Sequence, residues 1–245
     1  MTGDQIFLIL GIAGVAAVVK SIAGFGYPLL LLPVLAQFID VVDAVLIIAP
    51  SNLFLNVGIA WKLREHHSGA KTLPTFVVAG VVGAIGGTLL LPFLPVELFR
   101  LILFGILVAF LVNRISGFTF TFTDRTAHRM APVVGGVAGL FQGAAGVSGP
   151  IVTPWFLCID IDRDTFIYAI ASFFALTQIG QLVVAAINQL YATDTLVIGL
   201  LMIPLGIVSL PIGAIIRERI SVSAFEKVVI VLLAISAATL LIRLL

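Results

Sequence analysis

The chain carries little charge. Only 10% of its 245 residues are Asp, Glu, Lys or Arg, whereas about a quarter of an ordinary soluble domain is charged. The formal net charge is +1 and no basic stripe is present, which argues against a nucleic-acid partner. Because 61% of the residues are hydrophobic and the mean hydropathy is +1.24, a soluble domain of this size could not bury its apolar side chains and still present a charged surface to water. The composition predicts an all-α polytopic membrane protein.

Cysteine and histidine are also scarce. The single Cys158 excludes a disulfide framework and a cysteine metal site. Of the three histidines, His66 and His67 are adjacent and His128 falls in a predicted loop, so we expect no metal site. The chain has no GxGxxG, P-loop, Ser-His-Asp or HExxH pattern. We therefore predict that it binds no nucleotide or other cofactor and is not an enzyme.

Acidic residues are missing from the deep parts of the predicted spans. The cluster of Asp160, Asp162 and Asp164 lies near a span end, as do the other acids. A carboxylate inside the membrane is the usual relay for protons or sodium. Its absence argues against a simple proton-coupled cation transporter. It leaves anion uniport, anion exchange, or coupling through Lys20.

Long apolar runs dominate what is present. A membrane helix needs about 20 apolar residues, and charges and Pro/Gly clusters cut the chain into eight pieces. These pieces are 5–38, 41–60, 73–94, 97–115, 130–158, 164–190, 194–216 and 221–244. Two of them, 5–38 and 130–158, are too long for one crossing, and Gly and Pro interrupt each in its middle. Each is either one broken crossing or a re-entrant hairpin of two shorter helices.

The sequence also contains signs of an internal duplication. A shift of 122 positions places Gly24 and Pro28 on Gly146 and Pro150, and a shift of 126 aligns glycines further along the chain. We expect two repeats, each a broken or re-entrant Gly-Pro segment followed by three transmembrane helices. The predicted domains are a first repeat over 1–115, a cytoplasmic linker over 116–129 and a second repeat over 130–245.

The distribution of basic residues predicts the orientation. Loops 61–72 and 113–129 are rich in Lys and Arg and are expected in the cytoplasm. Loop 188–194 has no Lys or Arg, whereas the link at 217–219 has two Arg. This distribution obeys the positive-inside rule only if 130–158 enters the membrane and returns. Three crossings per half would then make the repeats inverted, with both termini outside the cytoplasm. A single crossing by 130–158 remains the alternative.

The two Gly-Pro interruptions are candidate binding elements. Inverted repeats with helices broken at the membrane midplane form a known transporter architecture. Pro28 and Pro150 suit the first turn of a helix, so the Gly-rich backbone before them would present N–H groups at two helix N-termini. Two such ends form an anion site, to which Ser21 and Ser148 would add hydroxyl donors. Alternatively, the glycines only permit close helix packing.

Buried polar residues accompany these interruptions. Lys20 lies roughly 22 Å along a helix that starts at residue 5, past the middle of a ~30 Å core. A charge there usually faces a cavity or a substrate, although it could also reach the interface or pair with a carbonyl. Its counterpart in the second repeat is the neutral donor Gln142. Asn52 and Asn56 share a helix face, and with Gln178 they either line the site or join helices.

The two broken segments, Gly24 to Pro28 and Gly143 to Pro150, resemble those of the TauE/SafE sulfite exporter family. The chain length, the four-plus-four organisation and the Asn-bearing second helix are similar to this family as well. The resemblance implies a transporter of the bacterial inner membrane that exports small sulfur-containing anions such as sulfite, sulfoacetate or thiosulfate. Phe25 and Tyr27 are bulky where small residues are frequent in the family.

The sequence thus predicts an anion transporter that binds its substrate between the two Gly-Pro breaks. The predicted substrate-binding residues are Lys20, Ser21, Gly24, Phe25, Gly26, Tyr27, Pro28, Asn52, Asn56, Gln142, Gly146, Val147, Ser148, Gly149, Pro150 and Gln178. The expected partners are a small anion and the lipid bilayer, and a homodimer is left open. An anion channel and an accessory membrane subunit without transport of its own remain the alternatives.

Overall fold

A computed structural model describes residues 3–35, 38–39, 41–90, 93, 97, 101, 104–105, 108, 111–112, 121–190 and 193–242. Regular structure in this described part of the chain is helical, as predicted. The elements are α1 (Gly3–Ala23), α2 (Tyr27–Leu35), α3 (Val41–Lys62), the 3₁₀ helix η1 (Arg64–Gly69), α4 (Leu73–Leu90), α6 (Asp124–Ala145), α7 (Gly149–Leu157), α8 (Arg163–Ile187), α9 (Thr193–Leu201), α10 (Ile203–Arg219) and α11 (Val222–Ile242). Most of the predicted piece 97–115 lies outside the described residues.

Several helices have the length and composition of membrane spans. Among the described residues, four qualify: Val42–Lys62, Leu73–Leu90, Arg163–Ile187 and Asp194–Arg219. Their outward faces are apolar, and on α4 both Val78 and Val82 are 67% exposed. Apolar side chains in such numbers on a surface fit contact with lipid rather than with water.

Both long apolar pieces are broken at the predicted glycines. Gly24 and Gly26 have φ of +83° and +106°, and Gly146 has φ of +66°. This left-handed region is accessible to Gly at no steric cost, so these three residues end the helices and turn the chain. Pro28 and Pro150 then occupy the second positions of α2 and α7, where a missing N–H costs nothing.

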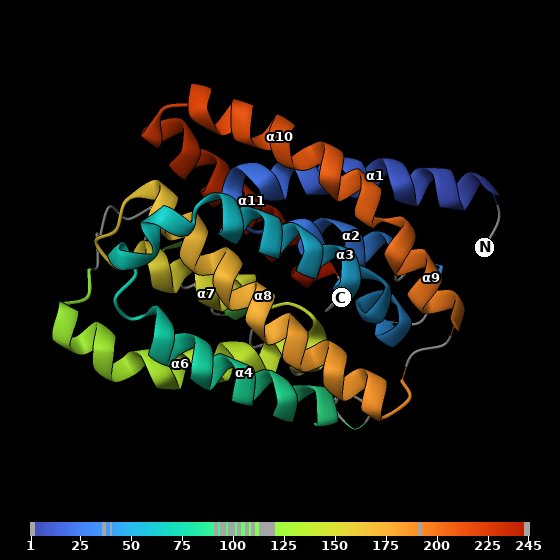
Figure 1. The fold of residues 1–245 in the computed structure, drawn as a ribbon, viewed down its shortest axis with the longest axis horizontal. Coiled ribbons are helices and arrows are strands. Elements are labelled where there is room, and N and C mark those ends of the chain that lie inside the picture. The colour runs from blue at the N-terminus through green and yellow to red at the C-terminus, as the bar shows by residue number, and fades with distance from the viewer. Residues whose placement is uncertain are drawn as a thin grey trace.

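The second broken piece is a re-entrant hairpin. The backbone N–H of Phe122, just before α6, donates to the carbonyl of Cys158, just after α7, at 2.8 Å. The chain therefore leaves the hairpin where it entered, and the alternative of a single crossing by 130–158 is wrong. The first piece also turns back, because α1 starts and α3 begins at the same end of the molecule (Figure 1).

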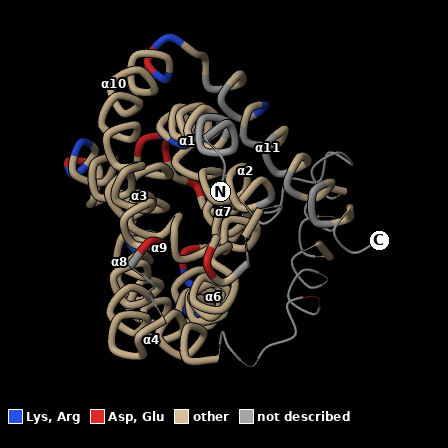
Figure 2. The backbone as a smooth tube through the Cα atoms, turned by 90° about the vertical axis from the view of Figure 1, so that its right-hand side faces the viewer, with Lys and Arg blue, Asp and Glu red and all other residues tan. Residues whose placement is uncertain are grey.

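The helices form layered pairs that exchange partners between the two halves. Helix α1 lies beside α10, α4 lies beside α6, and α3 and α8 lie between these pairs (Figures 1 and 2). Backbone meets backbone between α4 and α6, because a Cβ atom on Gly139 would collide with the Gly80 carbonyl and one on Gly83 with the Gly136 carbonyl. We call this contact the glycine seam; it fixes α4 firmly on α6.

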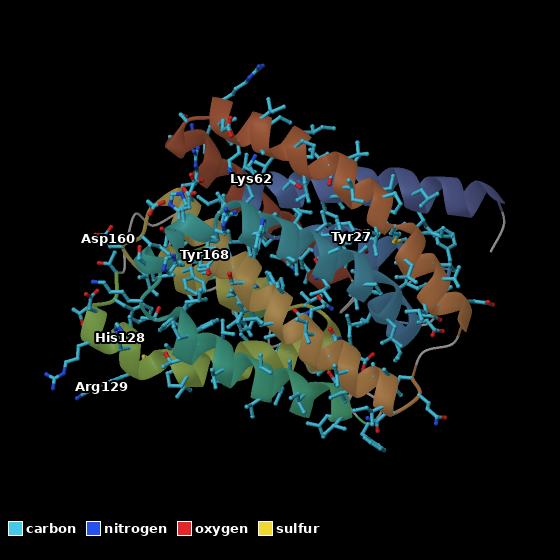
Figure 3. All side chains as sticks on the ribbon, viewed as in Figure 1. Tyr27, Lys62, His128, Arg129, Asp160 and Tyr168 are labelled. Carbon is cyan, nitrogen blue, oxygen red and sulfur yellow. The ribbon has the colours of Figure 1, made fainter. Side chains whose placement is uncertain are left out.

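Basic side chains gather at one end of the molecule, which we call the basic end. Its described members are Lys62, Arg64, Lys71, Arg125, Arg129, Arg163, Arg217 and Arg219. Lys62 and Arg129 mark this end in Figure 3, opposite the N-terminus. The loop 61–72 and the link at 217–219 thus share one side, as expected for a re-entrant second piece. The positive-inside rule predicts that this side faces the cytoplasm.

Two element boundaries differ from the prediction. Helix α6 begins at Asp124, inside the segment predicted as a linker, so the prediction of a loop at His128 is wrong. The Thr123 hydroxyl caps this earlier start by accepting from a backbone N–H. The piece 194–216 is two helices that meet at Met202, because Pro204 has no N–H for the preceding turn.

Candidate functional site

A small cavity lies where the two helix breaks meet, and we call it the tip cavity. It is lined by Lys20, Phe25, Gly26, Pro28, Leu29, Asn52, Gln142, Gly146, Val147, Ser148, Gly149 and Phe174. The volume open to the centre of a water molecule is about 10 Å³, which is room for about one water. The ends of α1 and α6, the starts of α2 and α7, and the middles of α3 and α8 therefore converge on one point.

Two helix N-termini border the tip cavity. Pro28 lies in the first turn of α2 and Gly149 begins α7, and both residues line the space. The first N–H groups of a helix have no acceptor within that helix, and the aligned peptide dipoles add partial positive charge there. A Cβ atom on Gly149 would stand 3.5 Å from Leu29 Cδ1, so the two tips lie close together. The two ends thus favour a negative group between them.

Lys20 brings a basic side chain to the same cavity. Its side chain is fully buried in the last turn of α1. The Nζ donates a hydrogen bond of 3.4 Å to the Gly24 carbonyl and lies 5.1 Å from the Phe174 ring centroid. An ammonium group has three donors, and no carboxylate is among the described residues that line the tip cavity. A buried cation without a counterion is costly inside a membrane, so the site favours an anion.

Gln142 adds an unused hydrogen-bond donor. The Ser148 hydroxyl donates to Gln142 Oε1 at 3.0 Å, which fixes the orientation of the amide. Gln142 Nε2 is buried and has no hydrogen-bond partner in the described part of the protein. A buried donor without a partner costs about 1–3 kcal/mol. An anion in the tip cavity would satisfy this donor and the Lys20 ammonium together.

A chain of amides supports the cavity wall. Asn52 Nδ2 donates to Gln178 Oε1 at 2.7 Å, and Gln178 Nε2 donates to Gln181 Oε1 at 2.8 Å. Gln181 Nε2 then donates to the Gly143 carbonyl at 3.5 Å. The chain joins α3, α8 and α6 behind the cavity, so Gln178 positions Asn52 and does not itself line the space.

Ten of the predicted site residues line the tip cavity, and six lie outside it. Those outside are Ser21, Gly24, Tyr27, Asn56, Pro150 and Gln178. The Ser21 hydroxyl donates to the Ala17 carbonyl of its own helix at 2.8 Å, so it is not available to a ligand in this arrangement. The Tyr27 hydroxyl lies 3.1 Å from Ser51 Oγ, away from the cavity.

Two lining residues were not predicted, Leu29 and Phe174. Phe174 stands 122 positions after Asn52, so the repeat offset applied to Asn52 would have identified it. Leu29 is an apolar residue in an apolar run, and nothing in the sequence distinguishes it.

A family model described as "Sulfite exporter TauE/SafE" matches residues 9–240. The chain belongs to the TauE/SafE family. This family consists of transporters of the sulfite and sulfur-anion exporter type and not of enzymes, which confirms the predicted membrane transporter. Together with the apolar helices, it identifies a multi-pass membrane protein. Searches of curated proteins and of solved structures gave no match.

Proposed function

We propose that this protein exports small sulfur-containing anions, such as sulfite, sulfoacetate or thiosulfate, across a bacterial inner membrane. The anion binds in the tip cavity. The proposal rests on one observation: the Lys20 side chain and Gln142 Nε2, which has no partner among the described residues, line the same buried space as two helix N-termini. The oxygens of a sulfite or sulfonate group accept hydrogen bonds from such donors, and their charge strengthens those bonds.

The size of the cavity suggests a carrier rather than a channel. Lys20 and Ser148 are both 0% exposed, so these two polar groups of the site are shielded from solvent. A water molecule occupies about 30 Å³ of liquid, and an oxyanion needs more room than one water. Binding therefore requires the two tips to move apart. A site that opens and closes around its ligand is typical of transporters, whereas a channel needs a continuous wet path.

We further propose that the two halves are inverted repeats. Reciprocal contacts support this: a Cβ on Gly24 would meet Ile167 Cγ2 at 3.3 Å, and one on Gly146 would meet Val45 Cγ1 at 2.8 Å. The shift of 122 relates Gly24 to Gly146 and Val45 to Ile167, so each break packs on the other half's equivalent residue. The pairing of α1 with α10 likewise mirrors that of α6 with α4. Helices α1 and α6 enter from opposite ends (Figure 1).

The binding site itself is not symmetric. Under the same shift Lys20 corresponds to Gln142, and Asn52 corresponds to Phe174. One side of the tip cavity therefore carries a cation over an aromatic ring, and the other carries two amides. A single ammonium group matches one anionic group at a time, and the amides supply neutral hydrogen bonds.

Uptake into proteoliposomes tests the proposed function. The labelled panel is sulfite, thiosulfate, sulfoacetate, sulfate and acetate. We expect saturable uptake of sulfur anions, reduced about tenfold or more by Lys20→Met, because a charged hydrogen bond contributes roughly 1.5–3 kcal/mol. Lys62→Met is the matched control, since Lys62 is exposed at the basic end and outside the cavity.

Two outcomes would contradict the proposal. One is that folded protein takes up none of the sulfur anions. The other is that Lys20→Met transports as well as Lys62→Met. Steady electrical current across the membrane in place of saturable uptake would support the channel alternative.

A further inference from the structure

A second cavity lies at the basic end of the protein. Its volume is about 250 Å³, and it lies between the segment after η1, the start of α6 and the end of α7. Lys71, His128 and Asp160 line this basic-end cavity, and Figure 3 shows His128 and Asp160 at that end. Helix α7 connects the two cavities, because Gly149 at its start lines the tip cavity and Phe156 near its end lines the basic-end cavity.

A continuous series of aromatic rings runs between these two cavities. Phe174 lines the tip cavity, and its ring centroid lies 5.7 Å from that of Phe173. The Phe173 centroid lies 5.0 Å from that of Phe76, which in turn lies 5.1 Å from that of Phe156. Trp155 stacks on Phe76 at 5.9 Å with an interplanar angle of 17°. The rings come from α8, α4 and α7, so three helices meet in this series.

We propose that Phe173, Phe76 and Phe156, which we call the ring stack, form the gate between the tip cavity and the basic end. The inference rests on the proposed function, since it assigns the path by which the anion of the tip cavity reaches one side of the membrane. All three rings are buried, at 0%, 0% and 1% exposure. An anion cannot pass such a dry apolar plug, because it would lose its hydration without gaining partners.

The position of Gly80 shows how closely the stack is fitted. A Cβ atom on Gly80 would stand 3.2 Å from both Cδ2 and Cζ of Phe173 and closer still to Cε2. The missing side chain at Gly80 therefore leaves the space that the Phe173 ring occupies. Because the glycine seam holds α4 on α6, Phe76 is the fixed member of the stack. Opening then requires α7 or α8 to move away from α4.

The opposite side of the tip cavity has a different barrier. The repeat shifts place Ser51 at the position equivalent to Phe173, and Met202 at that equivalent to Phe76. The Tyr27 hydroxyl lies 3.1 Å from Ser51 Oγ and 3.9 Å from Met202 Sδ. The equivalent positions on that side thus carry no ring stack. Loss of the stack should open the cavity towards the basic end alone.

Labelling of a cysteine in the tip cavity tests this gate. The reporter is Val147→Cys, placed in a Cys158→Ser chain so that the reporter carries the sole thiol. A small membrane-impermeant methanethiosulfonate is added to reconstituted vesicles from one side at a time. A separate Lys62→Cys chain identifies vesicles with the basic end outward, because Lys62 is exposed there.

We expect the reporter to be protected from the basic end when the ring stack is intact. Phe76→Ala should raise its labelling rate from that side at least tenfold and leave the rate from the other side unchanged. Phe141→Ala, which truncates a buried ring of α6 outside the stack, is the matched control and should not raise the rate. If Phe76→Ala does not fold, Phe173→Leu removes a ring of the stack while keeping most of its apolar volume.

Three results would overturn the gate. One is equally fast labelling from the basic end with the stack intact. Another is an unchanged rate in both folded stack variants. The third is an equal increase in Phe141→Ala, which would indicate general loosening. The labelling rate needs no knowledge of the transported anion. Failure of the proposed function would appear in the uptake assay, and failure of the gate would appear here.

Discussion

Replacing Gly87 by Ala should destabilise the protein, whereas the same replacement at the neighbouring Gly86 should not. A Cβ atom on Gly87 would stand 2.9 Å from the Ala144 nitrogen and 3.0 Å from the Leu140 carbonyl carbon, and closer still to the Leu140 oxygen. Among the described residues, a Cβ atom on Gly86 would meet nothing within 4 Å. Both residues lie on α4, so the pair isolates the effect of the glycine seam.

The expected difference follows from the geometry of the seam. Both substitutions gain the same helix propensity, up to about 1 kcal/mol, and this gain cancels in the comparison. A carbon–oxygen contact is comfortable at about 3.3 Å or more, so the Gly87 variant must push α4 and α6 roughly 1 Å apart. At that separation each atom pair across the seam loses a quarter to a half of its dispersion energy. Overpacking of this kind costs about 1–3 kcal/mol of stability. We expect Gly87→Ala to be less stable than Gly86→Ala by about that amount.

Thermal unfolding in detergent measures this difference through the fluorescence of the two tryptophans, Trp61 and Trp155. For a chain of this length, 1 kcal/mol shifts the Tm by about 2–4 °C. The Gly87 variant should therefore unfold roughly 2–12 °C below the Gly86 variant. If Gly87→Ala unfolded at the same temperature as Gly86→Ala or above it, the close backbone contact between α4 and α6 would be refuted.

Three further predictions concern the site and its support. Gln142→Glu keeps the shape of the side chain but adds a negative charge, which repels an anion at about 5 Å by roughly 3 kcal/mol at an effective dielectric constant of 20. Anion binding should therefore fall more than a hundredfold at neutral pH and recover as acid protonates the Glu. An affinity of this variant that does not change with pH would contradict the tip site. Gly149→Ala should leave the Tm near that of the unmodified protein, because its Cβ would make an ordinary 3.5 Å contact with Leu29. The same substitution should weaken anion binding about 5-fold or more, because the added methyl group fills the tip cavity. An affinity equal to that of the unmodified protein in a binding titration would count against the site. Asp162→Ala removes the N-cap of α8 and should cost about 1 kcal/mol at pH 7. Burial raises the pKa of Asp162, but hydrogen bonds from Thr165 and Asp164 outweigh it and hold the pKa below its ordinary 3.8. The stability advantage of the unmodified protein over Asp162→Ala should therefore shrink as the pH falls below about 4. A stability advantage that persists at lower pH would show that the capping carboxylate is not its source.

Much of the architecture could be predicted because glycine, proline and charge have direct structural consequences in a membrane. Gly24 and Gly146 adopt the left-handed conformation that breaks each helix, and Pro28 and Pro150 begin the next one. The absence of Lys and Arg from loop 188–194 favoured a re-entrant second piece, and the hydrogen bond from Phe122 to Cys158 confirms it.

The side chains that face the site were harder to predict, because the rotation of each helix depends on its packing partner. Lys20 and Ser21 are neighbours, yet Lys20 lines the tip cavity and Ser21 packs where Gly213 of α10 approaches. No sequence pattern specifies which helix will lie beside α1. The ring stack was missed for a similar reason, since Phe76 and Phe173 look like ordinary core residues until α4 and α8 are brought together.

Locating a bound anion in the protein tests the tip cavity as the binding site most directly. Selenite is a heavier analogue of sulfite, and its selenium can be located by anomalous diffraction in crystals of the Cys158→Ser protein, which has no thiol to react with it. We expect a selenium peak in the tip cavity, within hydrogen-bonding reach of Lys20 Nζ and Gln142 Nε2, that disappears in Lys20→Met. An ordered selenite elsewhere with the tip cavity empty, or a peak that persists without Lys20, would contradict it.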